Sequence, residues 1–286
     1  MNTSLIQRNL TLFFRDRMGV FFSLLAVLIV IILYAVFLGD VWLTESLENI
    51  DGAATLMDTW LIAGLLAIAS ITTTLGAFSV MIDDRIKKIN KDFYSSPVKR
   101  SNITFSYICS AFLIGVIMSC ITVVVAQIYI LMRGGDLFSA VSCVKTFLLI
   151  LLASLASTSI VCFIVSFFKS QNAFNTASTI LGVMIGFVTG IYLPVGALPG
   201  SAQTIVDVFP LSHAASLFRQ TLMDGPMKNV FDGVPAETVQ EFNEYMGVTL
   251  SIGSYEVTAL VSVLILIATV IIFFGLSLWS MSRKIL

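Results

Sequence analysis

The chain alternates between long apolar runs without charge and short polar segments. A membrane-crossing helix needs about 20 apolar residues, and one charge at its centre costs about 2.5–3.5 kcal/mol on insertion scales. Because these runs contain no Asp, Glu, Lys, Arg or His, they are predicted to be six transmembrane helices. The third is so long that we expect it to tilt or to project from the bilayer. The runs are residues 18–38, 59–82, 103–132, 146–168, 173–193 and 257–281.

The composition places the 286 residues in the same class. The chain is 57% hydrophobic and 12% charged, with a mean hydropathy of +0.97, far from a soluble domain. The expected fold class is therefore an all-α polytopic membrane protein. Four cysteines without a CxxC pair, together with one histidine, argue against a disulfide framework or a metal site. The net charge of −1 gives no reason to expect a nucleic-acid partner.

The charged residues divide unevenly between the two sides of the predicted membrane. The N-terminus, the segments after the second and fourth runs, and the C-terminus hold twelve basic and four acidic residues, whereas the alternate segments hold four basic and thirteen acidic ones. By the positive-inside rule, both termini are expected in the cytoplasm of a multi-pass plasma-membrane protein. The near-neutral total therefore hides a basic face and an acidic face.

The N-terminal segment has helical amphipathic spacing. Ile6, Leu10, Phe13 and Phe14 share one face of residues 4–17, and Gln7, Arg8, Thr11 and Arg15 occupy the other. Such a helix is typical of the membrane interface. We expect residues 1–17 to form an in-plane helix and residues 18–286 to form the six-helix transmembrane domain.

Residues 83–100 are the most charged stretch of the chain. Ile86, Ile89, Phe93 and Tyr94 recur at helical spacing, and Pro97 ends the pattern. Topology alone needs only Lys and Arg here. The added acids and the apolar face favour a short helix that docks on a cytoplasmic partner, rather than a solvated turn.

The segment between the fifth and sixth runs contains a broken apolar helix. Residues 191–200 place two prolines and two glycines where a helix would leave the membrane, and a second apolar stripe follows up to Phe209. This predicts a re-entrant hairpin, which is tolerated where protein or a water-filled cavity covers the backbone. Residues 194–256 are expected to form the hairpin and an outer cap, with helices near 211–223 and 235–246 separated at Gly225 and Pro226.

In this arrangement the chain resembles the permease subunits of type-2 ATP-binding-cassette (ABC) transporters, six-helix subunits of bacterial drug, antibiotic and polysaccharide exporters. The resemblance covers essentially the full length. It rests on the N-terminal helix, on the loop from Asp84 and Arg85 to the sequence Ser-Pro-Val-Lys-Arg ending at Arg100, and on the pattern from Gly190 to His213 with Arg219 after it.

The resemblance implies that two such subunits, identical or paralogous, pair in the membrane. Each would dock on a nucleotide-binding subunit through residues 83–100 and the shorter loop at 169–172. The chain has no Gly-x-x-x-x-Gly-Lys-Ser/Thr motif, so we expect no cofactor on it, with ATP and Mg²⁺ on the partner ATPase. The residues expected to couple to that ATPase are Asp84, Arg85, Lys88, Phe93, Pro97 and Lys169.

The resemblance further implies a translocation cavity lined by the second and fifth runs. Their polar groups are hydroxyls and amides, accompanied by aromatic and Met side chains that adapt to varied shapes. An uncharged cavity favours an amphipathic drug-like or antibiotic-like substrate, with a lipid-linked polysaccharide or teichoic-acid precursor as the alternative. The expected cavity residues are Thr72, Thr73, Phe174, Thr176, Met184 and Phe187, and the expected exit-hairpin residues are Pro194, Pro199, Pro210 and His213.

Three other functions fit the sequence less well. An intramembrane enzyme needs a base or metal ligands in the membrane, and an ion-coupled carrier keeps ionisable groups near the midplane. The six runs contain no Asp, Glu or His. A purely structural membrane protein gives no reason for the charged helical loop.

Overall fold

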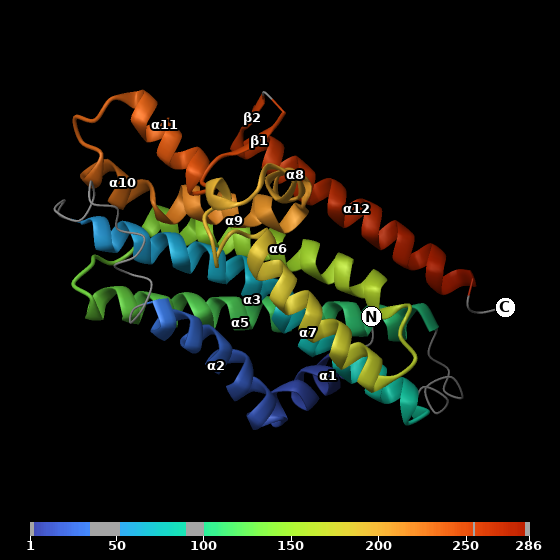
Figure 1. Cartoon of the computed structure of the whole chain (residues 1–286). Coiled ribbons are helices and arrows are strands. Elements are labelled where there is room, and N and C mark those ends of the chain that lie inside the picture. Colours follow the sequence, from blue (N-terminus) through green and yellow to red (C-terminus); the bar gives the residue numbers. More distant parts are fainter. Residues whose placement is uncertain (1–2, 35–51, 90–99, 254, 284–286) are drawn as a thin grey trace.

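The computed structural model describes residues 3–34, 52–89, 100–253 and 255–283, and these are mostly helical (Figure 1). The helices are α1 Thr3–Arg15, α2 Arg17–Leu33, α3 Ala53–Ile86, α5 Arg100–Met132, α6 Ala140–Val165, α7 Gln171–Val188, η2 Val195–Ala197 (a 3₁₀ turn), α8 Gly200–Val208, α9 Pro210–Leu222, α10 Asp224–Val230, α11 Ala236–Tyr245 and α12 Ala259–Arg283. Two short strands, β1 Leu250–Ile252 and β2 Tyr255–Val257, form an antiparallel hairpin in which Leu250 pairs with Val257. The all-α prediction is therefore right for the architecture but missed this hairpin.

Four described helices are long and apolar enough to cross a membrane: α3, α5, α6 and α12. The first two helices, α1 and α2, meet at a bend of 72° and add a fifth if the pair is taken as one span. The prediction of six spans is thus supported for four or five of them. The end of the first predicted span, beyond residue 34, lies outside the described residues.

The predicted fifth span ends earlier than its apolar run. The helix α7 stops at Val188 instead of residue 193, because Gly190 adopts a φ of +67° that an L side chain rarely takes. The amide of Ile191 then donates to the carbonyl of Gly186 at 3.1 Å, which is the bond of a Schellman helix end. With 18 residues and several amides near its start, α7 is not among the four long apolar helices.

The bundle is built around α3. This helix packs against α5, α6, α7 and α9, and its Trp60 and Phe78 are almost fully buried. Figure 1 shows α3, α5 and α6 side by side along one axis. The start of α1, the end of α12 and the α6–α7 turn lie at one end of the bundle, and α10 and α11 lie at the other.

A polar cluster joins α3 to α5 at each end of the bundle. At one end, the Asp84 carboxylate accepts hydrogen bonds from Arg8 of α1 at 2.7 and 2.8 Å and from the hydroxyl of Tyr107 at 2.6 Å. At the other, Asp58 accepts from Tyr129 at 3.0 Å and from Arg133 at 3.4 Å. Both carboxylates are buried, so each needs these partners.

The N-terminal helix forms as predicted, but its inward face packs on protein. Ile6 and Phe13 are buried, and α1 contacts α5, α3 and α2. Asn9, which the amphipathic pattern did not mark, is also buried and donates to the hydroxyl of Ser110 at 3.3 Å. The bond between Arg8 and Asp84 fixes α1 to the end of α3.

The segment after α7 differs in part from the predicted outer cap. The helices near 211–223 and 235–246 are present as α9 and α11. However, α9 is buried among α3, α6 and α12 rather than lying in a cap. Gly225 and Pro226, expected as breaks, lie in the first turn of α10, where the N–H group that a proline lacks would have no intrahelical acceptor.

The charged loop begins later than its composition suggested. The helix α3 continues through Asp83, Asp84 and Arg85 to Ile86, so the chain leaves the bundle only after that point. Most of the predicted docking helix, including Phe93, Tyr94 and Pro97, falls in residues 90–99, outside the described residues.

Replacing Gly247 with alanine should destabilise the fold more than replacing Gly233. Both glycines have a positive φ, +66° and +75°, so each alanine costs about 1–2 kcal/mol in backbone strain. At Gly247 the new Cβ would also lie 2.5 Å from Val195 and 3.0 Å from Arg219, whereas nothing lies within 4 Å at Gly233. Overpacking then adds about 1–3 kcal/mol. Melting temperatures in detergent measure the difference, and equal shifts would contradict the packing around Gly247.

Candidate functional site

A cleft of about 260 Å³ lies between α2, α3 and α7. Six of its twelve lining residues are aliphatic, four are serine or threonine, and a tyrosine adds a fifth hydroxyl group. None of its lining residues is charged. The lining residues are Ser23, Val27 and Val30 of α2, Leu65, Ile68, Ala69 and Thr72 of α3, Ser178, Thr179, Gly182 and Val183 of α7, and Tyr192 after it.

The walls of this cleft are shaped by two glycines of α7. A Cβ at Gly182 would enter the cleft with the Thr72 methyl group 4.0 Å away as its nearest neighbour, so this position leaves open space. A Cβ at Gly186 would collide with the ring of Tyr192. The missing side chain at Gly186 therefore lets Tyr192 lie against α7, where its ring packs edge-on against Phe187 with centroids 5.1 Å apart.

The predicted cavity residues separate into three groups. Thr72 lines the cleft. Thr73 and Phe174 are buried in the bundle: the Thr73 hydroxyl donates to the carbonyl of Ala69 at 2.6 Å, and the Phe174 ring packs on Phe168. Thr176, Met184 and Phe187 lie on an exposed face of α7.

Sequence reasoning missed most of the other cleft residues. Ser23, Gly182 and Tyr192 come from three separate parts of the chain, and nothing in their local pattern marks them. Gly182 and Gly186 are spaced by four residues in an apolar helix, which places both on one face. That spacing was the one local signal of a close approach.

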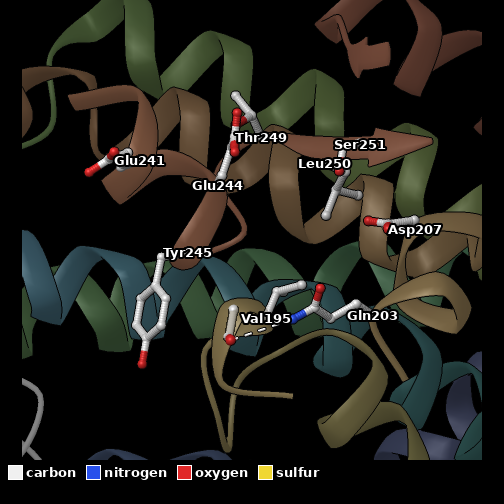
Figure 2. A pocket seen from close by; sticks show the side chains of 10 residues that line it. Val195, Gln203, Asp207, Glu241, Glu244, Tyr245, Thr249, Leu250 and Ser251 are labelled. Atoms are coloured by element: carbon white, nitrogen blue, oxygen red, sulfur yellow. Dashed lines mark hydrogen bonds between the residues drawn. The ribbon is translucent and has the colours of Figure 1, made fainter. Parts of the chain in front are cut away.

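A second cavity, of about 280 Å³, lies between the turn at Val195, α8, α11 and β1 (Figure 2). Figure 2 shows Asp207 on one side of it and Glu241 and Glu244 on the other. The amide of Gln203 crosses to the turn and donates to the carbonyls of Leu198 at 2.8 Å and Gly196 at 3.4 Å. Its lining residues include three acids and no base.

The acidic cavity has a negative wall without a metal-binding geometry. Burial raises the pKa of Asp207, and a hydrogen bond from the backbone of Ser251 partly offsets this. Among the described residues, no group of three or more His, Cys, Asp or Glu side chains could hold a metal ion. The cavity therefore presents separate carboxylates to whatever enters it.

The predicted coupling residues lie at the end of the bundle where α3 stops. Asp84 is buried and bound to Arg8 and Tyr107, so it holds α1 and α5 rather than facing a partner. Arg85 donates to the carbonyl of Phe168 at 2.9 Å, which joins the end of α3 to the α6–α7 turn. Lys88 and Lys169 are exposed there. Phe93 and Pro97 are outside the described residues.

The three predicted hairpin prolines each stand at the start of a helical element. Pro194 precedes η2, Pro199 precedes α8, and Pro210 is the first residue of α9. A proline fits there because its φ is already helical and the missing N–H has no intrahelical acceptor. The prolines therefore define the chain path after α7, as a broken helix requires.

His213 of α9 is fully buried and joins three elements. Its Nε2 lies 2.9 Å from the carbonyl of Asp207, and its Nδ1 lies 3.2 Å from the hydroxyl of Ser262 in α12. Since a carbonyl only accepts, Nε2 carries the proton and Nδ1 accepts from Ser262. Burial lowers the pKa of His213 despite the Asp207 bond, so the neutral ring is favoured and its role is to tie α8 and α9 to α12.

The helices and the cleft together define a class of protein. The described chain has four or five apolar helices that could cross a membrane and an uncharged cleft between three helices. Such a site can bind a molecule by shape and hydrogen bonds, and its lining offers no charged group for acid–base chemistry. The described residues therefore form a multi-helix membrane protein with an uncharged cleft.

The family follows from the sequence comparison. Residues 44–279 match the family described as ABC-2 family transporter protein. The chain belongs to this family, whose members are membrane components that work with ATP-binding subunits. No curated protein matches the chain at a significant level.

Proposed function

We propose that this chain is the permease subunit of an ATP-driven exporter and that the cleft between α2, α3 and α7 receives the transported molecule. The observation that carries the proposal is the lining of that cleft, which combines aliphatic side chains with five hydroxyls and no charge. A lining of this kind favours an amphipathic, drug-like or antibiotic-like molecule. A polysaccharide precursor would need more hydrogen-bonding groups than these five hydroxyls supply.

ATP hydrolysis belongs, in this proposal, to a separate nucleotide-binding subunit carrying ATP and Mg²⁺. The end of α3 and the α6–α7 turn would contact that subunit, since Arg85 already joins them through the carbonyl of Phe168. Lys88 and Lys169 supply exposed positive charge beside this junction. This end is then cytoplasmic, and the start of α1 and the end of α12 lie at the same end of the bundle in Figure 1.

A second permease subunit, identical or paralogous, would cover the exposed face of α7. Ile180, Val183, Met184 and Phe187 follow one another at helical spacing there, and each is about half exposed. This row borders the cleft through Val183. In a pair of subunits the two clefts would therefore open toward a shared interface within the plasma membrane.

Filling the cleft tests the proposal. Replacing Gly182 with leucine puts a branched side chain into the open space beside Thr72. A pocket that no longer has room for one or two methylene groups of a molecule selects against that molecule by about tenfold or more. ATP-dependent transport should therefore fall by about that factor. The assay is uptake of a fluorescent amphiphile into inverted vesicles that contain this chain and its ATPase.

The matched control is Gly275→Leu. Gly275 is also a helical glycine, in α12, with nothing within 4 Å of a new Cβ, and it does not line the cleft. Its variant should transport at the rate of the unmodified protein. If Gly182→Leu transports normally, the substrate does not pass through this cleft. If fluorescent amphiphiles are not transported but a lipid-linked saccharide is, the alternative substrate class is correct.

A further inference from the structure

Arg219, near the end of α9, is a buried guanidinium that binds backbone carbonyls instead of an acid. It is 1% exposed. Its Nη2 donates to the carbonyls of Thr189 and Gly190 at 2.9 and 3.0 Å, and its Nη1 donates to that of Gly247 at 3.1 Å. Burial lowers its pKa to about 9, so the group still carries its charge at neutral pH. No described carboxylate forms an ion pair with it.

The carbonyls bound by Arg219 belong to two chain segments, each of which follows the end of a helix. No N–H group of a described helix is bonded to these carbonyls. Thr189 and Gly190 directly follow the last residue of α7. Carbonyls at the end of a helix lack intrahelical donors. Gly247 follows α11. A positively charged donor satisfies such carbonyls and also interacts favourably with the negative end of the helix dipole. One side chain thus fixes the end of α7 and the end of α11 to α9.

The helix α3 completes the arrangement through Trp60. Its indole N–H donates to the carbonyl of Met246 at 2.8 Å, and its ring lies under the Arg219 guanidinium at 4.9 Å from the ring centroid. A cation over an indole face is attracted to it, most strongly where water is excluded. Arg219 therefore touches groups from α3, α7 and α11 while belonging to α9.

The contacts of Arg219 limit how the end of α7 can move. A buried guanidinium that loses its acceptors is costly, because the charge is then neither hydrated nor paired. The end of α7 must therefore stay bound to Arg219, or it must move far enough for water to reach the group. Since α7 and the following Tyr192 form one wall of the cleft, the choice between those states changes the shape of the cleft.

We propose that Arg219 is a positioning residue that holds the end of α7 in place and so sets the α2–α3–α7 cleft during the transport cycle. The link to transport rests on the proposed function. The hold on α7 does not, because it concerns contacts within this chain. Hydrogen exchange on the chain alone and transport by the complex therefore test the two parts separately.

The first experiment compares hydrogen exchange of the chain in lipid nanodiscs for the unmodified protein and Arg219→Lys. Lysine keeps the charge but cannot reach carbonyls in two segments with a planar fork. The reporters are the amides of Thr189, Gly190 and Ile191, which bond back to the last turn of α7. Their exchange should rise by about tenfold or more, while the amides of α5 keep their rates.

The matched control is Ser216→Ala in the same helix. The Ser216 hydroxyl donates to the carbonyl of Val248 at 2.6 Å, so its loss affects the segment after α11 and leaves the bonds to α7. Exchange should rise near residue 248 and stay unchanged at the end of α7. Unchanged exchange at Thr189–Ile191 in Arg219→Lys would overturn the proposal, as would a uniform rise that includes α5. In the unmodified protein these three amides must also exchange as slowly as α9, and fast exchange there overturns the proposal without any variant.

The second experiment measures coupling in the complex with the ATPase subunit. Arg219→Lys should lose at least tenfold in transport per ATP hydrolysed, and Ser216→Ala should keep the unmodified ratio. A stability defect alone would lower the amount of active complex without changing that ratio, so an unchanged ratio in Arg219→Lys overturns the role in transport. If the unmodified complex shows no ATP-driven transport at all, the proposed function fails, while the exchange result still decides whether Arg219 holds α7.

Discussion

Replacing Asp84 with alanine is expected to destabilise the folded protein by about 1.5–3 kcal/mol, because the buried Tyr107 hydroxyl loses its acceptor and Arg8 loses two charge-assisted hydrogen bonds. The Asp84 side chain is 5% exposed and accepts three hydrogen bonds from Arg8 and Tyr107. The variant loses the junction of α1, α3 and α5 in one step. Unfolding in mixed detergent micelles, followed by circular dichroism, measures the loss.

The neighbouring residue supplies the control for this prediction. Asp83 is 47% exposed and pairs with Lys87 one helical turn away, and exposed pairs of this kind contribute little. Asp83→Ala should therefore unfold at the same detergent fraction as the unmodified protein. A double-mutant cycle with Arg8→Ala should show strong coupling to Asp84. Equal effects of Asp83→Ala and Asp84→Ala would show that the buried cluster is not formed.

The sequence predicted the apolar parts of the long helices well, because runs without charge mark them, although α3 continues beyond its run at both ends. The runs at 59–82, 103–132, 146–168 and 257–281 lie within α3, α5, α6 and α12 or overrun them by three residues at most. The prediction was wrong at the end of α7, where the apolar run continues to residue 193 although the chain turns at Gly190. Hydropathy does not respond to a left-handed glycine, and so it counted the residues after the turn as helix.

The cleft was predicted only in part, because adjacent residues of a helix face different directions. Thr72 and Thr73 are neighbours in sequence, yet Thr72 lines the cleft and Thr73 points into the bundle. Successive positions in a helix are about 100° apart, so a run of three threonines cannot all face one cavity. Which of them does depends on how α3 is rotated against α2 and α7, and this is a property of tertiary packing.

The buried polar groups were the least predictable feature. Asp58, Asp84 and Arg219 look in the sequence like charges that flank spans or lie in outer segments. Each is buried because partners from distant parts of the chain satisfy it: Tyr129 and Arg133, Arg8 and Tyr107, or backbone carbonyls. No local pattern encodes such pairings, whereas their energetic cost makes them decisive once the fold is formed.

Reversing the charge of Arg85 and Lys88 together should lower ATP-dependent transport by about a hundredfold, since each tenfold loss corresponds to about 1.4 kcal/mol and two charges are reversed at one junction. The variant Arg85→Glu with Lys88→Glu should still insert into the membrane, because both residues lie beyond the apolar part of α3. The measurement is stimulation of ATPase activity by a transported amphiphile in reconstituted vesicles.

Two further variants separate docking from an internal effect. Arg85→Gln removes the bond to the carbonyl of Phe168 without reversing charge, and it should lose much less than the double reversal. Lys228→Glu changes an exposed lysine in α10, at the other end of the bundle, and should have no effect. Salt screens the interactions between exposed charges. The loss of activity caused by Lys88→Glu alone should therefore become smaller as ionic strength rises. Unchanged amphiphile-stimulated ATPase activity in the double variant would mean that the ATPase docks elsewhere on the chain.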